Sequence, residues 1–151
     1  MQLDYKGARY YGCEGEKSDS IPSIVVSAVN EDSEAIGVGR LVSCGSSFRA
    51  CRRPVTKEDM AESALGIVLD EHGANNLKPG KTASILRQGR AFVCLESEVK
   101  KPGEAVYVKP GGLFGGKSGV KDTQLKGAIF CSPGNKGDVI EMEINLMGGV
   151  A

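Results

Sequence analysis

The stretch Lys81–Pro110, KTASILRQGRAFVCLESEVKKPGEAVYVKP, is the most informative part of this chain. Its apolar residues fall into three short runs, none of which repeats at helical spacing and each of which is too short for a stable helix. The stretch therefore predicts three consecutive strands, arranged as a meander. The runs are Thr82–Leu86, Ala91–Leu95 and Ala105–Val108, and they are separated by Gly89 and by the pair Pro102-Gly103.

The segment Lys101-Pro102-Gly103-Glu104 has the residue order of a type II turn. Proline at the second position presets φ, and glycine at the third accepts a positive φ without steric cost. A tight turn is therefore expected immediately before the third run.

The rest of the chain alternates short apolar runs with glycine-containing turns. In the run Val139–Leu146 apolar and polar residues alternate, which is typical of an antiparallel strand with one solvated side. About nine short strands predict an all-β fold, a small antiparallel β-sandwich or barrel of jelly-roll-like form, with an extended N-terminal arm and a glycine-rich loop. The other strand candidates are Ile24–Val29, Ile36–Cys44, Leu65–Leu69 and Ala128–Cys131, and Thr56 is expected to cap a short helical turn that reaches about Ser63.

Length and charge set limits on the kind of protein. A chain of 151 residues predicts one domain with a self-sufficient core, and we divide it into an arm, 1–23, and one β domain, 24–151. Nineteen acidic and 19 basic residues balance and are scattered, so no general attraction to nucleic acid or anionic lipid is expected. We find neither a signal-peptide core nor a membrane-length apolar run, and we expect synthesis in the cytoplasm.

The first 20 residues, MQLDYKGARYYGCEGEKSDS, show neither helical nor strand periodicity. They contain three of the four tyrosines of the chain together with several charged residues and glycines. Two interpretations remain open: a frayed chain end, or an arm that becomes ordered on a partner, because tyrosine and arginine are well suited to interfaces. On the second interpretation the candidate contact residues are Tyr5, Arg9, Tyr10 and Tyr11.

The cysteines and the single histidine do not predict a metal site. The five cysteines include no C-x-x-C pair, whereas zinc sites usually use closely spaced ligands. We interpret Cys44, Cys94 and Cys131 as small apolar residues of strands, and His72 as a turn residue. No metal and no cofactor are predicted.

A glycine-rich segment, Gly111–Gly119, matches the phosphate-binding motif G-x-x-x-x-G-K-[ST] at residues 111–118. A true phosphate loop needs a helix that starts at the Lys-Ser pair, so that its first N–H groups meet the phosphates. No amphipathic stretch follows Lys117, and the acidic strand Ile67–Glu71 comes before the loop instead of after it. We therefore predict a loop between strands and take four of its residues as interface candidates: Gly112, Leu113, Phe114 and Lys117.

The sequence also gives little support for nucleophilic catalysis. With one histidine and no G-x-S-x-G turn, a Ser-His-Asp arrangement cannot be assembled from recognisable parts. The sequence therefore predicts a protein that is not an enzyme and has no catalytic residues.

Four short sequence segments in a fixed order, followed by a characteristic C-terminal part, resemble the structural cement proteins of tailed bacteriophages. The resemblance covers roughly residues 36 to 147, and it is carried by the order and spacing of the segments. The segments are Ile36–Val42, Ala64–Leu69, Ile85–Val93 and Pro102–Val108, and the C-terminal part is Gly127–Phe130 followed by Val139–Leu146.

The resemblance implies a non-enzymatic β protein on the outer surface of the capsid that bridges neighbouring major capsid protein subunits and stabilises the shell. It implies the major capsid protein as partner. We also expect the chain to associate with itself; a homodimer is favoured, and a homotrimer stays open as the alternative. Exposed edge strands, Ile24–Val29 or Val139–Leu146, could pair with a neighbouring chain. The alternatives are a phage tail or baseplate module and a small ligand-binding β-barrel.

Overall fold

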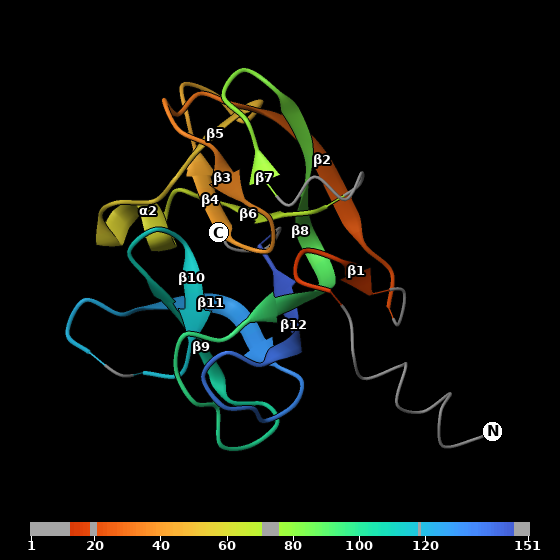
Figure 1. The fold of residues 1–151 in the computed structure, drawn as a ribbon, viewed down its shortest axis with the longest axis vertical. Helices are drawn as coiled ribbons and strands as arrows, with labels where there is room; N and C mark the ends of the chain where they lie inside the picture. Colours follow the sequence, from red (N-terminus) through yellow and green to blue (C-terminus); the bar gives the residue numbers. More distant parts are fainter. Residues whose placement is uncertain (1–12, 19–20, 71–75, 118, 147–151) are drawn as a thin grey trace.

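A computed structural model describes residues 13–18, 21–70, 76–117 and 119–146, which form twelve strands and one short helix (Figure 1). The strands are β1 Lys17–Ser18, β2 Ile24–Asn30, β3 Ile36–Gly37, β4 Leu41–Cys44, β5 Ala50–Arg52, β6 Ala64–Val68, β7 Asn76–Leu77, β8 Thr82–Cys94, β9 Ala105–Lys109, β10 Leu113–Gly115, β11 Thr123–Phe130 and β12 Val139–Asn145, and the helix is α2 Lys57–Ala61. The predicted all-β class is confirmed.

The first two runs of the opening stretch form one continuous strand, β8, so the expected break at Gly89 is wrong. Gly89 has φ +133, and a Cβ there would lie 2.9 Å from the Cβ of Ser23. Glycine is therefore needed for a close approach between chain segments and not for a turn. The strand continues because β12 pairs with it on both sides of this residue, with Ile144 opposite Gly89.

The strand β8 connects two groups of strands, β2 to β7 above and β9 to β12 below in Figure 1. On its first half it pairs with β2 and β6, and on its second half with β1 and β12. The upper pairings β8-β2-β5-β4-β6 close into a ring, because β6 pairs with both β4 and β8. The finer expectation of a jelly-roll-like sandwich or barrel is not confirmed.

The prediction of a central meander is also wrong, because β12 and β11 lie between β8 and β9 in the sheet. The strand β12 is consequently an interior strand and not an exposed edge. Its alternation is as predicted: Ile140, Met142 and Ile144 are buried, whereas Asn145 is exposed. Pairing between β2 and β5 is parallel, so the large sheet is mixed and not purely antiparallel.

Two apolar cores lie on opposite faces of the strands that they share. Adjacent residues of β8, Ile85 and Leu86, belong to different cores, and so do Leu41 and Val42 of β4. All four side chains are fully buried. The sequences of these strands contain consecutive apolar residues because both faces of each strand are covered.

The expected strand Ile36–Cys44 is divided into β3 and β4 at Gly39. Gly39 has φ +76, and a Cβ there would clash with the side chain of Glu14. Glycine at this position therefore permits a close approach between residues 14–15 and residue 39. The predicted helix cap is confirmed, since Thr56 and Asp59 form a capping box at the start of α2.

Part of the expected N-terminal arm belongs to the sheet. Lys17–Ser18 form β1 and pair with Arg90 and Ala91 of β8. The N–H of Gly15 donates to the Phe92 oxygen at 2.8 Å, and its own carbonyl accepts from Asp70 at 2.9 Å. Residues 13–18 are therefore held by the β domain.

Candidate functional site

The glycine-rich segment is a short strand and not an open loop. Residues Leu113–Gly115 form β10, which pairs with β9 and brings Phe114 opposite Val108. The carbonyl of Gly112 accepts a hydrogen bond from the Leu41 N–H at 2.9 Å. Gly112 has φ +85, and a Cβ there would clash with the Leu41 carbonyl oxygen. The segment is therefore fixed against β4 by residues that sequence reasoning placed in a loop.

A nucleotide site is not assembled by this segment. A strand instead of a curved loop precedes Lys117, and within residues 119–130 the chain forms a turn and then β11, with no helix. Phosphate binding at a Walker-type loop depends on N–H groups at a helix start, which these described residues do not provide. Lys117 is exposed.

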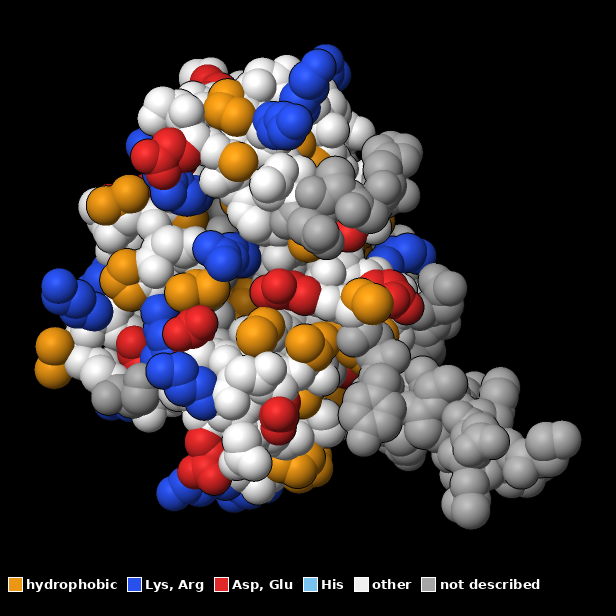
Figure 2. Space-filling model, in the orientation of Figure 1, with side chains coloured by type: hydrophobic (Ala, Val, Ile, Leu, Met, Phe, Trp, Pro, Cys, Tyr) orange, Lys and Arg blue, Asp and Glu red, His pale blue; other side chains and the backbone are white. Residues whose placement is uncertain are grey.

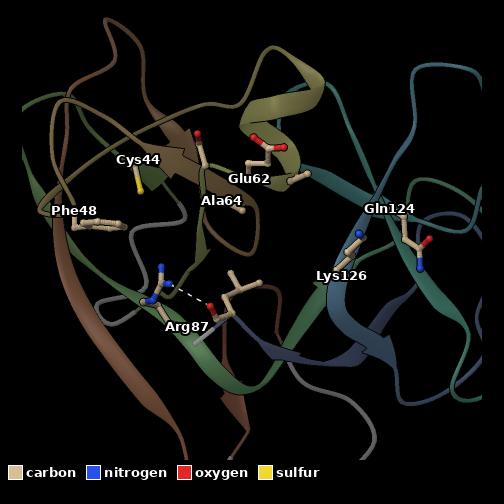
Figure 3. Close-up of a pocket in the computed structure, with 10 residues that line it drawn as sticks. Cys44, Phe48, Glu62, Ala64, Arg87, Gln124 and Lys126 are labelled. Atoms are coloured by element: carbon tan, nitrogen blue, oxygen red, sulfur yellow. Dashed lines mark hydrogen bonds between the residues drawn. The ribbon is translucent and has the colours of Figure 1, made fainter. Parts of the chain in front are cut away.

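An open groove of about 560 Å³ lies between the upper and lower groups of strands. Figure 3 shows Phe48, Cys44 and Arg87 on one side of the groove and Lys126 and Gln124 on the other. The guanidinium of Arg87 is held by two backbone carbonyls, those of Leu65 at 2.7 Å and Leu146 at 3.4 Å. The complete lining is Cys44, Phe48, Ala61, Glu62, Ser63, Ala64, Arg87, Gln124, Lys126 and Leu146.

The groove is bordered by an apolar side chain that has no role in the core. Phe48 is 71% exposed at the turn between β4 and β5. Val55, ahead of α2, is 72% exposed. Figure 2 shows basic and acidic side chains mixed over one face, with apolar ones in small separate groups. The apolar side chains at these two loop positions are accessible to another protein, whereas the mixed charge gives no field that would collect nucleic acid.

Four of the five cysteine thiols are unsuited to nucleophilic chemistry. Burial raises the pKa of Cys51 and of Cys131 to about 11, and it also raises the pKa of Cys44 and Cys94. Since the thiolate is the reactive form, these side chains are protonated and inert at neutral pH. Among the described residues no group of three or more His, Cys, Asp or Glu side chains could hold a metal ion.

Polar contacts of Asp59 stabilise the start of α2. Asp59 of α2 accepts from the Val55 and Thr56 N–H groups at 3.2 and 3.3 Å, and it pairs with Arg52 at 3.3 Å. Burial alone would raise the pKa of Asp59, but these hydrogen bonds and the Arg52 charge together hold it below its usual value.

In the part of the chain that the structure describes, no helix is long and apolar enough to span a membrane.

The predicted contact residues fall into two groups. Tyr5, Arg9, Tyr10 and Tyr11 lie outside the described residues, as does His72. In the glycine-rich segment Gly112 and Phe114 are buried, with Phe114 only 1% exposed, so their side of the segment faces the core. Of these four candidates Leu113 is half-buried and only Lys117 is exposed.

Sequence reasoning missed Phe48, Val55 and Arg87 as surface features. The signal for Phe48 was an aromatic residue directly after the turn-forming Gly45-Ser46-Ser47. Arg87 gave a weaker signal, a charged residue inside an apolar strand. Its place in a groove depends on β6 and β12 meeting beside β8, which no local pattern contains.

Comparison with known proteins gives one family. The model of the family described as "Structural cement protein (E217 gp24/Pam3 gp6)" matches residues 1–145. A chain of the solved structure "The capsid of Myoviridae Phage XM1" has the same fold, with a TM-score of 0.69 and 15% identity over 90% of this chain and 91% of that chain. No curated protein matches the sequence.

A second solved structure is more distant: "The crystal structure of head fiber gp8.5 N base in bacteriophage phi29" matches with a TM-score of 0.48 and 9% identity over 83% of this chain and 96% of that chain.

Proposed function

Because this chain belongs to the structural cement proteins of bacteriophages, a family of capsid structural proteins, we propose that it binds the outer surface of the assembled head across boundaries between major capsid protein subunits. There it stabilises the shell without catalysing a reaction. Many identical weak contacts add up through the symmetry of the capsid, because each bound copy stabilises only the assembled state. We favour dimers over trimers as the bound unit.

The observation that carries this proposal is the family match over residues 1–145, which includes both the N-terminal segment and almost the whole β domain. The surface fits the role in two ways. Equal numbers of acidic and basic residues let many copies lie side by side without mutual repulsion. The rigid strands offer apolar side chains at their turns, of which Phe48 is the largest.

Two parts of the chain are the proposed capsid contacts. The first is the N-terminal arm with Tyr5, Arg9, Tyr10 and Tyr11, since these residue types dominate the energetics of protein interfaces. The second is the groove beside Phe48, which would take an apolar side chain of the capsid protein. Replacing Phe48 by Ala should weaken attachment and leave the fold intact, whereas replacing Val120, which is 89% exposed in the connection between β10 and β11, should change neither.

The experiment that tests the proposal is imaging of purified particles at a resolution that resolves secondary structure. Density for β8 with its flanking groups of strands should be found on the outside of the head, in contact with two or more capsid subunits. Density on the inner surface, or in contact with one subunit only, would reject the bridging role.

The alternative function is a tail or baseplate module, because such modules are also rich in strands and glycine. Separation of heads from tails before mass spectrometry distinguishes the two functions. The cement role predicts the chain in the head fraction, whereas the alternative predicts it in the tail fraction.

A further inference from the structure

One edge of the large sheet is left open at β2. This strand runs along β8 for its whole length, but on its other side β5 pairs only with Val29 and Asn30. In Figure 1 β2 lies at the outer margin of the upper group of strands. Among the described residues, the backbone of its first five residues therefore has a strand on one side only.

The direction of each backbone group follows from the hydrogen bonds at the end of β2. The N–H of Asn30 donates to Lys81 oxygen beside β8, and the N–H of Val29 donates to Arg49 oxygen beside β5, both at 2.9 Å. Because successive residues of a strand face opposite sides, the N–H and C=O groups of Val25 and Ser27 point away from β8. Within the described residues these groups pair with no other backbone group.

The edge lacks the features by which proteins usually block such strands. Its sequence, IVVSAVN, contains no charged residue and no proline. Ile24 and Val25 are each 40% exposed, and Ser27 is exposed as well. An uncharged, partly apolar and unpaired strand edge is a template for pairing with another strand.

We propose that two copies of this chain pair antiparallel through the open edges of their β2 strands. A two-fold axis at Val26 places Val25 of each copy opposite Ser27 of the other. This register forms four hydrogen bonds, because each of the two residues offers one N–H and one C=O. Because β2 contains no charged residue, this register brings no like charges together. The contact is the same on both copies, as a two-fold interface requires.

The partner is a second copy because the donor and acceptor pattern of Val25 and Ser27 is complementary to itself. The inference deepens the proposed function by giving the contact that makes the bound unit a dimer. The inference is tested on the free protein. A negative result would therefore not decide whether the chain attaches to the head.

The experiment measures the molecular mass of the purified full chain by sedimentation velocity. The unchanged chain should have the mass of a dimer. Ser27→Pro removes one outward N–H at a position where an edge strand tolerates proline, and Ser27→Lys places a charge on the edge, so both should be monomeric. Val120→Lys, on a loop residue that is 89% exposed, should remain dimeric.

The register is tested by cross-linking two variants, Val25→Cys and Ser27→Cys, each of which adds one cysteine to a background in which Cys13, Cys44, Cys94 and Cys131 are replaced by Ser and only the buried Cys51 is kept. Mixing them under oxidising conditions should give a cross-linked pair, because the two residues face each other across the axis. Each variant alone should not cross-link, because equivalent residues lie diagonally, about 7–8 Å apart, which is too far for a disulfide.

Several results would overturn the inference. These are a monomeric unchanged chain at the highest soluble concentration, a dimer that persists in both Ser27 variants, or cross-links in the single variants but not in the mixture. Loss of head attachment in Ser27→Lys together with a monomeric unchanged chain would assign the edge to a strand of the capsid protein instead.

Discussion

The ammonium nitrogen of Lys109 lies 2.7 Å from Oδ2 of Asp122, and this ion pair closes the glycine-rich segment between β9 and β11. The side chains are 13% and 6% exposed. The same carboxylate oxygen accepts from the Gly119 N–H at 3.0 Å, and the ammonium group lies 3.5 Å from the Gly116 oxygen. The glycine-rich segment, whose sequence matches a phosphate loop, is thus held by an ion pair between two residues that flank it.

Replacing Lys109 by Met should destabilise the protein by about 3 kcal/mol, because the substitution leaves the carboxylate of Asp122 buried without its cation. Urea unfolding followed by circular dichroism measures the change in the free energy of unfolding. Lys121→Met, at an exposed position of the turn before β11, is the control and should change it by no more than about 0.5 kcal/mol. Equal effects of the two substitutions would show that the ion pair does not brace the segment.

Two neighbouring glycines should respond differently to alanine. Gly111 and Gly112 have φ +90 and +85, so alanine strains the backbone at both, by roughly 1–2 kcal/mol. Space is open around Gly111, whereas a Cβ at Gly112 runs into the Leu41 carbonyl. Gly112→Ala should therefore cost about 1–3 kcal/mol more than Gly111→Ala in the same unfolding experiment. A smaller or reversed difference would mean that β10 shifts away from β4 at little cost.

Lys117→Ala tests the phosphate-loop motif directly. The side chain is exposed, so thermal stability and particle assembly should stay within about 0.5–1 kcal/mol of the unchanged chain. Calorimetric titration with ATP and magnesium should give no binding heat for either protein. Magnesium-dependent ATP binding that this substitution abolishes would restore the enzyme hypothesis and reject the cement role.

The stability contributed by Asp59 should depend on pH. Its pKa is lowered in the folded state, so its contribution is fully present above its usual pKa of 3.8 and is lost as the pH falls through the lower folded value. Asp59→Asn should therefore be less stable than the unchanged chain by about 1–2 kcal/mol at pH 7, the size of a lost helix cap. The difference should shrink below pH 4, and a difference that stayed constant down to pH 2 would contradict this assignment.

Two truncations separate the arm from the sheet. Removing residues 1–12 should leave the free energy of unfolding within about 1 kcal/mol and weaken co-sedimentation with empty capsids, because it removes Tyr5, Arg9, Tyr10 and Tyr11. Removing residues 1–20 should destabilise the fold by about 2–4 kcal/mol, because it also removes β1 and the hydrogen bonds of Gly15 and Glu16, each contributing about 1 kcal/mol. Unchanged capsid binding by the shorter truncation would assign attachment to the β domain.

Much of the fold could be predicted because its signals are local. The alternation of Val139–Leu146, the capping box of Thr56 and Asp59, and the turn at Gly103, which has φ +82, depend on neighbouring residues and were read correctly. The interruption expected at Gly89 was wrong, because a glycine that ends a strand and one that permits a close approach look the same in sequence. The pairing of β12 with β8 distinguishes them.

The pairing order and the site could not be predicted for the same reason. Strand order depends on which apolar faces meet, and β8 meets β2, β6, β1 and β12, which come from both ends of the chain. The glycine-rich segment was misread because its strand, β10, has only three residues and gains its stability from β9 and from Leu41. The turn Gly45-Ser46-Ser47 indicates an exposed position for Phe48, but the groove beside it is formed by residues from distant parts of the chain, such as Arg87 and Lys126.

Heating of heads with and without this chain tests the cementing role most directly. DNA-filled particles that lack the protein should have the same geometry as complete particles but release their DNA at a lower temperature, measured by the fluorescence of a DNA-binding dye. Adding back the purified chain should restore the original temperature. Equal release temperatures with and without the chain would contradict the account, even though the β fold would remain correct.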